Sequence, residues 1–147
     1  MSTVIVDYES GNLHSAEKAF QRMAAEVGAG PVTVTSDPDV VRRASRVVLP
    51  GDGAFPACQK ELYDHRGLFE AIEDVVITKG QPFFGICIGM QMLATRGMEY
   101  SETPGFDWIS GTVERINPKD DTLKVPHMGW NDLVIDHVHH VHPVFDG

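Results

Sequence analysis

Short apolar runs along the chain alternate with longer segments in which apolar residues recur every three or four positions. The runs lie at residues 4–6, 32–35, 46–49 and 83–86, and turn-forming residues such as Gly, Pro, Asp or Asn bound them. Runs of this kind predict strands that are buried on both faces of a sheet.

The segments between these runs predict helices. The apolar stripe at residues 13–27 predicts a helix that Asn12 caps and Gly28 ends. Further helices are predicted at 37–44, where Asp37-Pro38 opens the helix, at 68–79, where Gly80 ends it, and at 88–94.

Strand and helix alternate four times, so the sequence predicts an α/β fold with a doubly wound, mostly parallel sheet flanked by helices. Functional groups in such folds lie just beyond the carboxyl ends of the strands. Gly11, residues 51–53 and Cys87 all occupy such positions.

The pattern changes from residue 112 onward. Apolar segments at 112–116, 123–125 and 133–135 predict short antiparallel strands joined by turns, with no helix between them. The chain stops on Val144-Phe145-Asp146-Gly147, and we expect from this abrupt end that sequence is missing.

Composition narrows the class of protein. The 147 residues carry a net charge of −9, which argues against a nucleic-acid footprint and against a polybasic membrane patch. No apolar run approaches the roughly 18 residues of a membrane span, and the first residues lack the basic start of a signal peptide. Two cysteines, without a CxxC pair, do not make a disulfide framework. We expect a cytosolic globular chain that binds neither nucleic acid nor membrane.

Cys87 is the leading candidate for chemistry. It stands in Gly85-Ile86-Cys87-Ile88-Gly89, a G-x-C-x-G motif at a predicted strand-to-helix junction, which is the cysteine form of the nucleophile elbow. A Cβ on either glycine would strike the neighbouring backbone of so tight a turn. The helix N-terminus favours a thiolate, and the Ile88 N–H is placed to stabilise an oxyanion. The alternative is that Cys87 is a buried small hydrophobe, the common fate of a free cysteine.

Two other features of the sequence lie near this motif or share its residue type. The turn Pro50-Gly51-Asp52-Gly53 is a candidate second half of an oxyanion hole, although most such turns are only turns. It is not a phosphate loop, since no G-x-x-x-x-G-K-[ST] run exists. Cys58 has no elbow-forming flanks, and we interpret it as structural.

A cysteine nucleophile needs a histidine base and a group that orients it. Seven histidines are present, four of them crowded into residues 137–142. Because their spacing matches no recognised ligand pattern, a solvated histidine-rich turn is favoured over a zinc site. No metal and no cofactor is expected.

Four stretches, in order along the chain, resemble the glutaminase subunits of imidazole glycerol phosphate synthase, which are class I (triad) glutamine amidotransferases of histidine biosynthesis. They are Asp7-Tyr8-Glu9-Ser10-Gly11-Asn12-Leu13, Leu49-Pro50-Gly51-Asp52-Gly53-Ala54-Phe55, Gly85-Ile86-Cys87-Ile88-Gly89-Met90-Gln91 and Lys124-Val125-Pro126-His127-Met128-Gly129-Trp130-Asn131. The resemblance implies a flavodoxin-like class I amidotransferase domain over residues 1–147, incomplete at its C-terminus.

The resemblance also implies the chemistry. Cys87 would attack the side-chain amide of L-glutamine, form a glutamyl thioester and release ammonia, while Gln91 holds the substrate. Gly51, Asp52 and Gly53 would supply the switchable half of the oxyanion hole, whose peptide must reorient before the site is competent, and Ile88 the other half.

The family delivers its ammonia to a partner. The resemblance implies a (β/α)₈ cyclase subunit that makes imidazole glycerol phosphate and aminoimidazole carboxamide ribotide. Gly11, Asn12, His127, Met128, Trp130 and Asn131 would lie toward that subunit. For Trp130, a core aromatic remains the alternative.

The sequence departs from the family pattern at two places. Asp52 stands where Val is common, and its carboxylate would be unfavourable near an oxyanion unless it points away. His142-Pro143-Val144 only imitates the catalytic His-Pro-Glu segment. We therefore expect the catalytic His and Glu to be absent from these residues, and the 147-residue chain to be inactive alone.

Two alternatives to a working glutaminase follow. One is a non-catalytic chain that only docks on the cyclase, since a nucleophile is present without its base. The other is an α/β-hydrolase-type cysteine hydrolase, which would need a downstream Asp and His and leaves the 126–131 stretch without a role.

Overall fold

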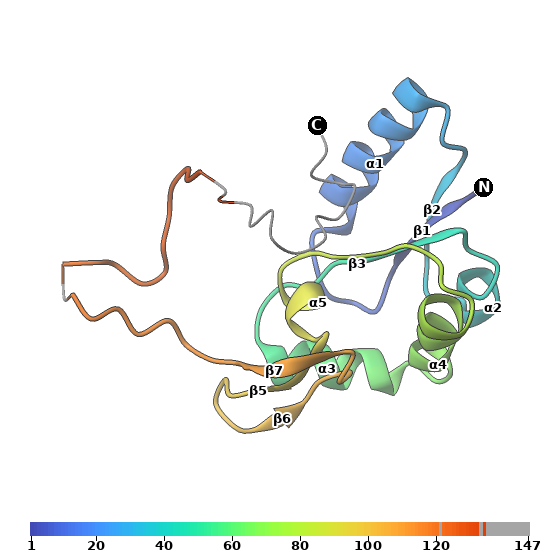
Figure 1. Cartoon of the computed structure of the whole chain (residues 1–147). Helices are drawn as coiled ribbons and strands as arrows, with labels where there is room; N and C mark the ends of the chain where they lie inside the picture. The colour runs from blue at the N-terminus through green and yellow to red at the C-terminus, as the bar shows by residue number, and fades with distance from the viewer. Residues whose placement is uncertain (121, 133, 135–147) are drawn as a thin grey trace. The chain divides into compact units, whose positions relative to one another are not determined.

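The computed structural model describes residues 1–120, 122–132 and 134. The chain divides into two compact units, Met1–Arg115 and Ile116–Gly147, and each is described by itself. All helices and strands of the described residues lie in the first unit (Figure 1). None of these helices combines the length and the apolar character needed to span a membrane.

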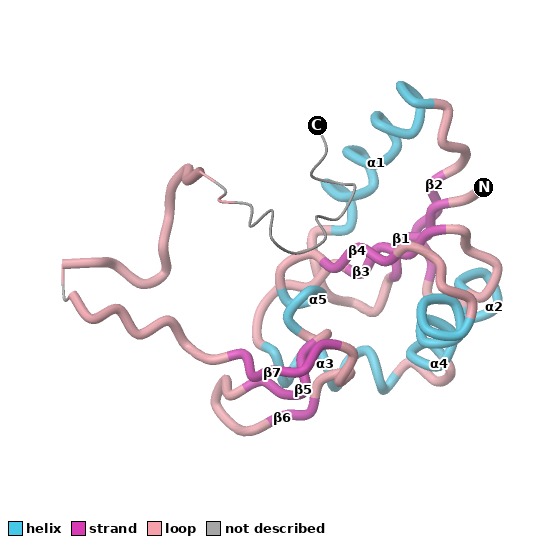
Figure 2. The backbone as a smooth tube through the Cα atoms, in the orientation of Figure 1, coloured by secondary structure: helices cyan, strands magenta, loops and turns pink. Residues whose placement is uncertain are grey.

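A four-stranded parallel sheet forms the centre of the first unit (Figure 2). Its strands are β1 (Thr3–Val6), β2 (Val32–Thr35), β3 (Arg46–Leu49) and β4 (Phe83–Gly85), in the order β2-β1-β3-β4. This order is that of a doubly wound sheet whose direction switches between β1 and β3. The predicted α/β fold class is confirmed, and the four strands predicted for this sheet agree with the observed ones to within a residue.

Burial along the strands follows their place in the sheet. All four residues of β1 are buried, as are three of the four in β3. The outer strands β2 and β4 contain no buried residue. The continuous apolar runs at 4–6 and 46–49 therefore belong to the two central strands, which neighbouring strands protect on both sides.

Helices cover the two faces of this sheet. Helix α1 (Leu13–Val27) lies on one face, and α2 (Pro38–Val41) and α4 (Leu68–Glu73) lie on the other (Figures 1 and 2). Asn12 caps α1 by accepting the Ser15 N–H at 3.1 Å, and Gly28 ends it in the left-handed conformation, as predicted.

Two predicted helices differ in their extent. Helix α2 opens at Asp37-Pro38 as predicted, with Asp37 as its N-cap, but it ends at Val41 rather than at residue 44. The predicted helix at 68–79 is present as α4 followed by a π-helical segment, η1 (Asp74–Thr78).

Helix α3 (Phe55–Asp64) was not predicted from the sequence. It buries Phe55, Cys58 and Leu62, which are spaced three and four residues apart and face the core. Its N-cap residue Ala54 offers no capping side chain. The missing cap comes from Glu99, whose carboxylate accepts the Phe55 N–H at 2.8 Å.

The predicted helix at 88–94 is wrong in its second half. Helix α5 (Ile88–Gln91) is one turn long, and the chain then enters β5 (Ala94–Gly97). β5 pairs antiparallel with β6 (Thr103–Pro104) and parallel with β7 (Ile109–Val113). The predicted strand at 112–116 is thus shifted, because the backbone of β7 pairs along β5 from Ile109 to Val113. This pairing is parallel, so the prediction of an antiparallel strand is wrong here.

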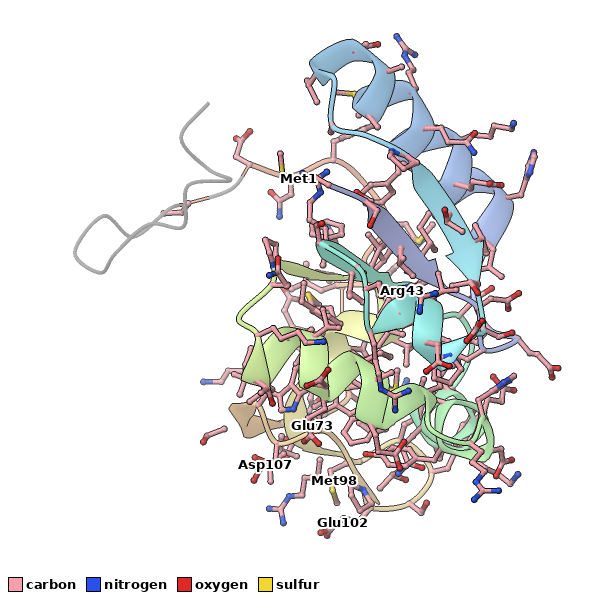
Figure 3. The ribbon with its side chains drawn as sticks, turned by 90° about the vertical axis from the view of Figure 1, so that its right-hand side faces the viewer. Met1, Arg43, Glu73, Met98, Glu102 and Asp107 are labelled. Atoms are coloured by element: carbon pink, nitrogen blue, oxygen red, sulfur yellow. The ribbon has the colours of Figure 1, made fainter. Side chains whose placement is uncertain are left out.

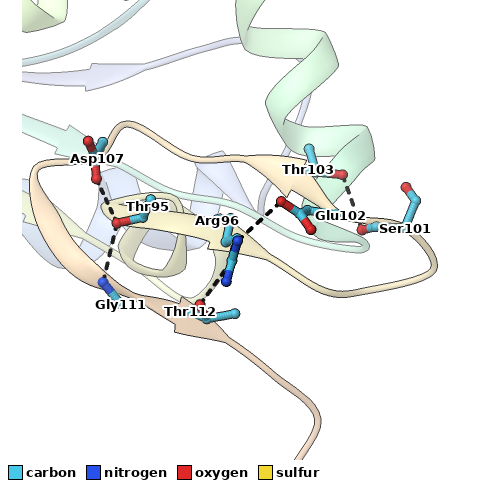
Figure 4. A network of polar contacts seen from close by, with 8 residues as sticks. All are labelled: Thr95, Arg96, Ser101, Glu102, Thr103, Asp107, Gly111 and Thr112. Carbon is cyan, nitrogen blue, oxygen red and sulfur yellow. Dashed lines mark hydrogen bonds and ion pairs between the residues drawn. The ribbon is translucent and has the colours of Figure 1, made fainter.

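Polar side chains on this small sheet hold its strands together (Figure 4). Thr95 Oγ1 donates to Asp107 Oδ1 at 2.6 Å and accepts the Gly111 N–H at 3.3 Å. Arg96, on β5, contacts the residue before β6 and a residue of β7, with Nη1 3.3 Å from Glu102 Oε1 and Nε 3.2 Å from Thr112 Oγ1. These contacts are exposed to solvent, so each stabilises the sheet only modestly.

Aromatic side chains join the loop between β6 and β7 to α4. The ring centroid of Phe69 lies 5.0 Å from that of Phe106, which in turn lies 5.1 Å from the ring centroid of Trp108. Figures 1 and 3 show the small sheet, marked in Figure 3 by Met98, Glu102 and Asp107, at the end of this unit opposite to α1.

The described residues of the second unit contain no helix and no strand. The strand predicted at 123–125 is therefore not observed. Positions 133 and 135 of the predicted strand at 133–135 lie outside the described residues, as does the histidine-rich stretch at 137–142.

Candidate active site

Three loops meet at the carboxyl ends of β1, β3 and β4, where a doubly wound sheet presents its site. They are residues 7–12 after β1, residues 50–54 after β3 and residues 86–87 after β4. The Ile86 N–H donates to Leu49 O at 2.9 Å, which extends the pairing of β3 and β4 to the residue before Cys87.

Cys87 stands at the junction of β4 and α5 with a strained backbone. Its φ of 55° and ψ of −115° are rare for a residue with a side chain, and such conformations cost on the order of 1–3 kcal/mol. The Met90 and Gln91 N–H groups donate to Cys87 O at 3.1 and 3.0 Å, which fixes this residue to the first turn of α5. The Cys87 side chain is exposed. The alternative of a buried small hydrophobe is therefore wrong.

The glycines on either side of Cys87 leave no room for a side chain. A Cβ on Gly89 would lie 1.9 Å from Leu49 O, and one on Gly85 would lie 2.6 Å from Met90 Cα. Both distances are far inside van der Waals contact with backbone atoms. This confirms the steric reason given for the glycines of the motif.

The 50–53 turn packs directly against the start of α5. A Cβ on Gly51 would lie 2.7 Å from Gly89 N and 2.8 Å from Ile88 Cβ. Gly53, in contrast, has no atom within 4 Å of its Cβ position and a φ of 98°. One end of the turn is thus held against α5, and the other end is open.

Buried side chains hold the peptide groups of this turn. The Tyr8 hydroxyl donates to Pro50 O at 2.5 Å. The Asp52 N–H donates to Ser10 Oγ at 3.2 Å, and the Ser10 hydroxyl lies 3.0 Å from Asp52 O. Because an N–H carries one hydrogen, the Asp52 N–H in this conformation is directed to Ser10.

Tyr8 keeps its proton in this setting. Burial is the main cause that raises the pKa of its phenol well above its usual range, and the nearby Cys58 thiol adds to the shift. The phenol therefore remains a hydrogen-bond donor to Pro50 at all physiological pH values.

The Asp52 side chain is exposed to solvent. Water can hydrate the carboxylate there, so its charge does not have to be buried in the site, where it would lie near a developing oxyanion. The substitution that departs from the family pattern is compatible with this backbone.

Ile88 and Gln91 lie at the two ends of α5. The Ile88 side chain is buried, and its N–H, as the first of the helix, has no intrahelical acceptor. Gln91 is half-buried and follows Cys87 by about one helical turn.

The residues expected at a partner surface fall in both units. Gly11 packs on the 50–53 turn, with its Cβ position 3.0 Å from Pro50 Cβ, and Asn12 caps α1. His127, Met128, Trp130 and Asn131 lie in the second unit, and all four are exposed. Trp130 is fully exposed, so the alternative of a core aromatic is wrong.

Tyr8, Ser10 and Glu99 were not predicted as site residues, and Cys58 was interpreted as structural. All four contact the 50–55 segment from 6 to 44 residues away. The spacing of Phe55, Cys58 and Leu62 is a signal that would have predicted α3 and placed Cys58 beside the turn.

Comparison with known proteins gives a consistent result. The family Glutamine amidotransferase class-I matches residues 4–146. The chain is 65% identical over 147 residues to the imidazole glycerol phosphate synthase subunit HisH of Ruegeria pomeroyi and 67% identical over 147 residues to that of Cereibacter sphaeroides. Each match covers all of this chain and 68% of the relative. The HisH subunit of Mesorhizobium japonicum is 48% identical over 148 residues, with 67% of that relative covered.

Proposed function

The chain belongs to the glutamine amidotransferase class-I family, among the HisH subunits of imidazole glycerol phosphate synthase, and we propose that Cys87 is the nucleophile of its glutaminase reaction. The observation that carries the proposal is the exposed, strained Cys87 between two glycines that admit no Cβ. A fold retains such strain where it serves a site.

The reaction begins when the Cys87 thiolate attacks the side-chain amide carbon of glutamine. A C–S bond forms, and the carbonyl electron pair moves onto oxygen. The tetrahedral intermediate then expels its nitrogen, which leaves as ammonia after receiving a proton from the histidine of the triad. A glutamyl thioester remains, and water hydrolyses it to glutamate and regenerates the thiol.

Two backbone N–H groups would stabilise the oxyanion. The Ile88 N–H is free of an intrahelical acceptor and directly follows the nucleophile. The second donor comes from the Gly51, Asp52 and Gly53 turn. Because the Asp52 N–H here donates to Ser10, its peptide must reorient before that group can reach an oxyanion.

Gln91 would hold the glutamine substrate. Its N–H donates to Cys87 O, so the turn that presents the nucleophile also fixes the backbone of Gln91. A side-chain amide offers both a donor and an acceptor, which suits the ammonium and carboxylate of an amino acid.

The ammonia would pass to a cyclase subunit with a (β/α)₈ barrel in a cytoplasmic heterodimer. We place Gly11, Asn12, His127, Met128, Trp130 and Asn131 toward that subunit. Support comes from Met128 and Trp130, whose side chains are 86% and 104% exposed. Large exposed apolar side chains of this kind are typical anchors of protein interfaces.

These 147 residues contain no His-Pro-Glu segment. The activity is therefore tested in a protein of the relatives' length that contains this sequence, mixed with its cyclase. Cys87→Ala should lower glutamine-dependent synthesis by about 10³-fold or more, because triad members act as a unit.

Ammonia-dependent synthesis is the internal control of this experiment. The cyclase needs only the released nitrogen nucleophile, so the Cys87→Ala protein should retain that activity at the wild-type level. Equal loss of both activities would show that Cys87 supports the fold or the complex and is not the nucleophile.

A further inference from the structure

Two buried side chains from different elements meet at the Asp52 peptide groups. Ser10, from the loop after β1, is 6% exposed, and Cys58, from the first turns of α3, is 0% exposed. Ser10 Oγ lies 3.1 Å from Cys58 Sγ, and Cys58 Sγ lies 3.2 Å from Asp52 O. With the two contacts between Ser10 and Asp52, these distances close a ring of polar atoms.

The hydrogens available in this ring determine what it holds. The Asp52 N–H has Ser10 Oγ as its acceptor. One hydroxyl and one thiol hydrogen remain for three contacts. In each arrangement that avoids a clash of two hydrogens, Asp52 O accepts at least one of them. The ring therefore holds the peptide group before Asp52 by its N–H and the group after it by its carbonyl.

The thiol reaches this ring from a fixed point. The Cys58 N–H donates to Ala54 O at 3.0 Å, so the first turn of α3 ties Cys58 to the end of the turn that it contacts. Removing the thiol would leave buried polar groups with fewer partners, which costs more than losing the same bond in water.

We propose that Cys58 is a positioning residue of the 50–53 turn, which holds the Asp52 peptide groups in register with Cys87 through its contacts with Ser10 and Asp52. The proposal deepens the proposed function, since the turn would supply an oxyanion donor. It differs from the interpretation of Cys58 as core filling, which requires only its volume.

The test measures hydrogen exchange of the Asp52 amide by NMR in the purified chain. Cys58→Ser keeps a hydrogen-bonding group at this position, whereas Cys58→Ala and Cys58→Val remove it, and Val also keeps the volume filled. We expect exchange within about twofold of wild type for Cys58→Ser and about three- to tenfold faster exchange for the Ala and Val variants. Ser10→Ala, which removes the acceptor itself, should accelerate exchange most.

The amide of Val48, in the centre of β3, serves as the internal control, because its exchange reports global unfolding and therefore measures any loss of overall stability in a variant. The proposal is overturned if Cys58→Val retains the Asp52 protection while Cys58→Ser loses it, because protection would then follow volume. It is also overturned if the Asp52 and Val48 amides accelerate together. If Cys58→Ala does not fold, the comparison of Ser with Val decides.

The readout does not involve glutamine. A failure of the Cys87→Ala experiment would refute the proposed function and leave the exchange result intact. Loss of the pattern in exchange would refute the role of Cys58 and leave Cys87 as nucleophile.

Discussion

The two cysteines should differ sharply in reactivity toward a thiol reagent in the folded chain. Cys87 is exposed, whereas Cys58 is 0% exposed and contacts Ser10 and Asp52 through its sulfur. Iodoacetamide can reach Cys58 only when α3 opens away from the core. Mild labelling near neutral pH should therefore modify Cys87 first.

The size of the difference follows from the free energy of that opening. A core helix opens at a cost approaching the global stability, and an opening free energy of about 5 kcal/mol slows labelling by roughly 10³- to 10⁴-fold. Burial sets this ratio more than the electrostatics of α5 does, because α5 is one turn long and its dipole is correspondingly small.

Peptide mass spectrometry after timed labelling measures both rates in one sample. Labelling in denaturant is the control, and there the two rates should converge. Comparable rates in a sample that circular dichroism shows to be folded would refute the burial of Cys58. Faster labelling of Cys58 than of Cys87 would remove the physical basis of the nucleophile elbow.

Two further predictions concern stability. Gly89→Ala places a Cβ 1.9 Å from backbone oxygen and should destabilise the fold by about 3 kcal/mol or more, lowering Tm by roughly 10 °C. Gly28→Ala is the control, at φ 64° with nothing within 4 Å of its Cβ position, and should cost only about 1 kcal/mol. Equal losses of stability in the two variants, measured by calorimetry, would contradict the close approach at Gly89. Burial raises the pKa of Tyr8, so the unfolded state releases this proton first. The contribution of this pKa shift to the free energy of unfolding should be fully present below about pH 10 and lost above it. Above that pH, the free energy of unfolding should therefore fall more steeply than in Tyr8→Phe. The same dependence on pH in both proteins, measured by denaturant titration at several pH values, would contradict this.

The large sheet could be predicted from the sequence because its signals are local. Each of its four strands is a short apolar run between turn residues. The two central strands, β1 and β3, are buried as fully as continuous runs imply. The caps of α1 were also predictable, since Asn12 and Gly28 act on backbone groups within a few residues.

The elements that were missed depend on distant partners. Helix α3 begins without a capping side chain of its own and receives its cap from Glu99, 44 residues along the chain. The predicted helix at 88–94 stops early because residues from Ala94 onward pair with β7, which lies 15 residues further on at its start. The local periodicity of the sequence gives no information about either of these distant contacts.

The candidate site likewise has a local part, which could be predicted from the sequence, and a part that depends on residues distant in the chain. Cys87 and its glycines form a motif of five adjacent residues, so sequence alone located them. The groups that hold the 50–53 turn come from Tyr8 and Ser10, 42 residues away in the chain. Only the pairing of β1 with β3 brings these loops together.

The two ends of the 50–53 turn differ in how closely the rest of the fold contacts them. Gly51 packs so closely on Gly89 that a Cβ would not fit, and the Tyr8 hydroxyl donates to the Pro50 carbonyl. The Pro50–Gly51 end of the turn is therefore fixed against the start of α5. Asp52 is exposed, and Gly53 has open space around its Cβ position. Reorienting the peptide groups on either side of Asp52 would therefore break their contacts with Ser10 and Cys58. Under the proposed function, such a turn would keep its Pro50–Gly51 end fixed beside Cys87 while the two peptide groups of Asp52 reorient to complete the oxyanion hole.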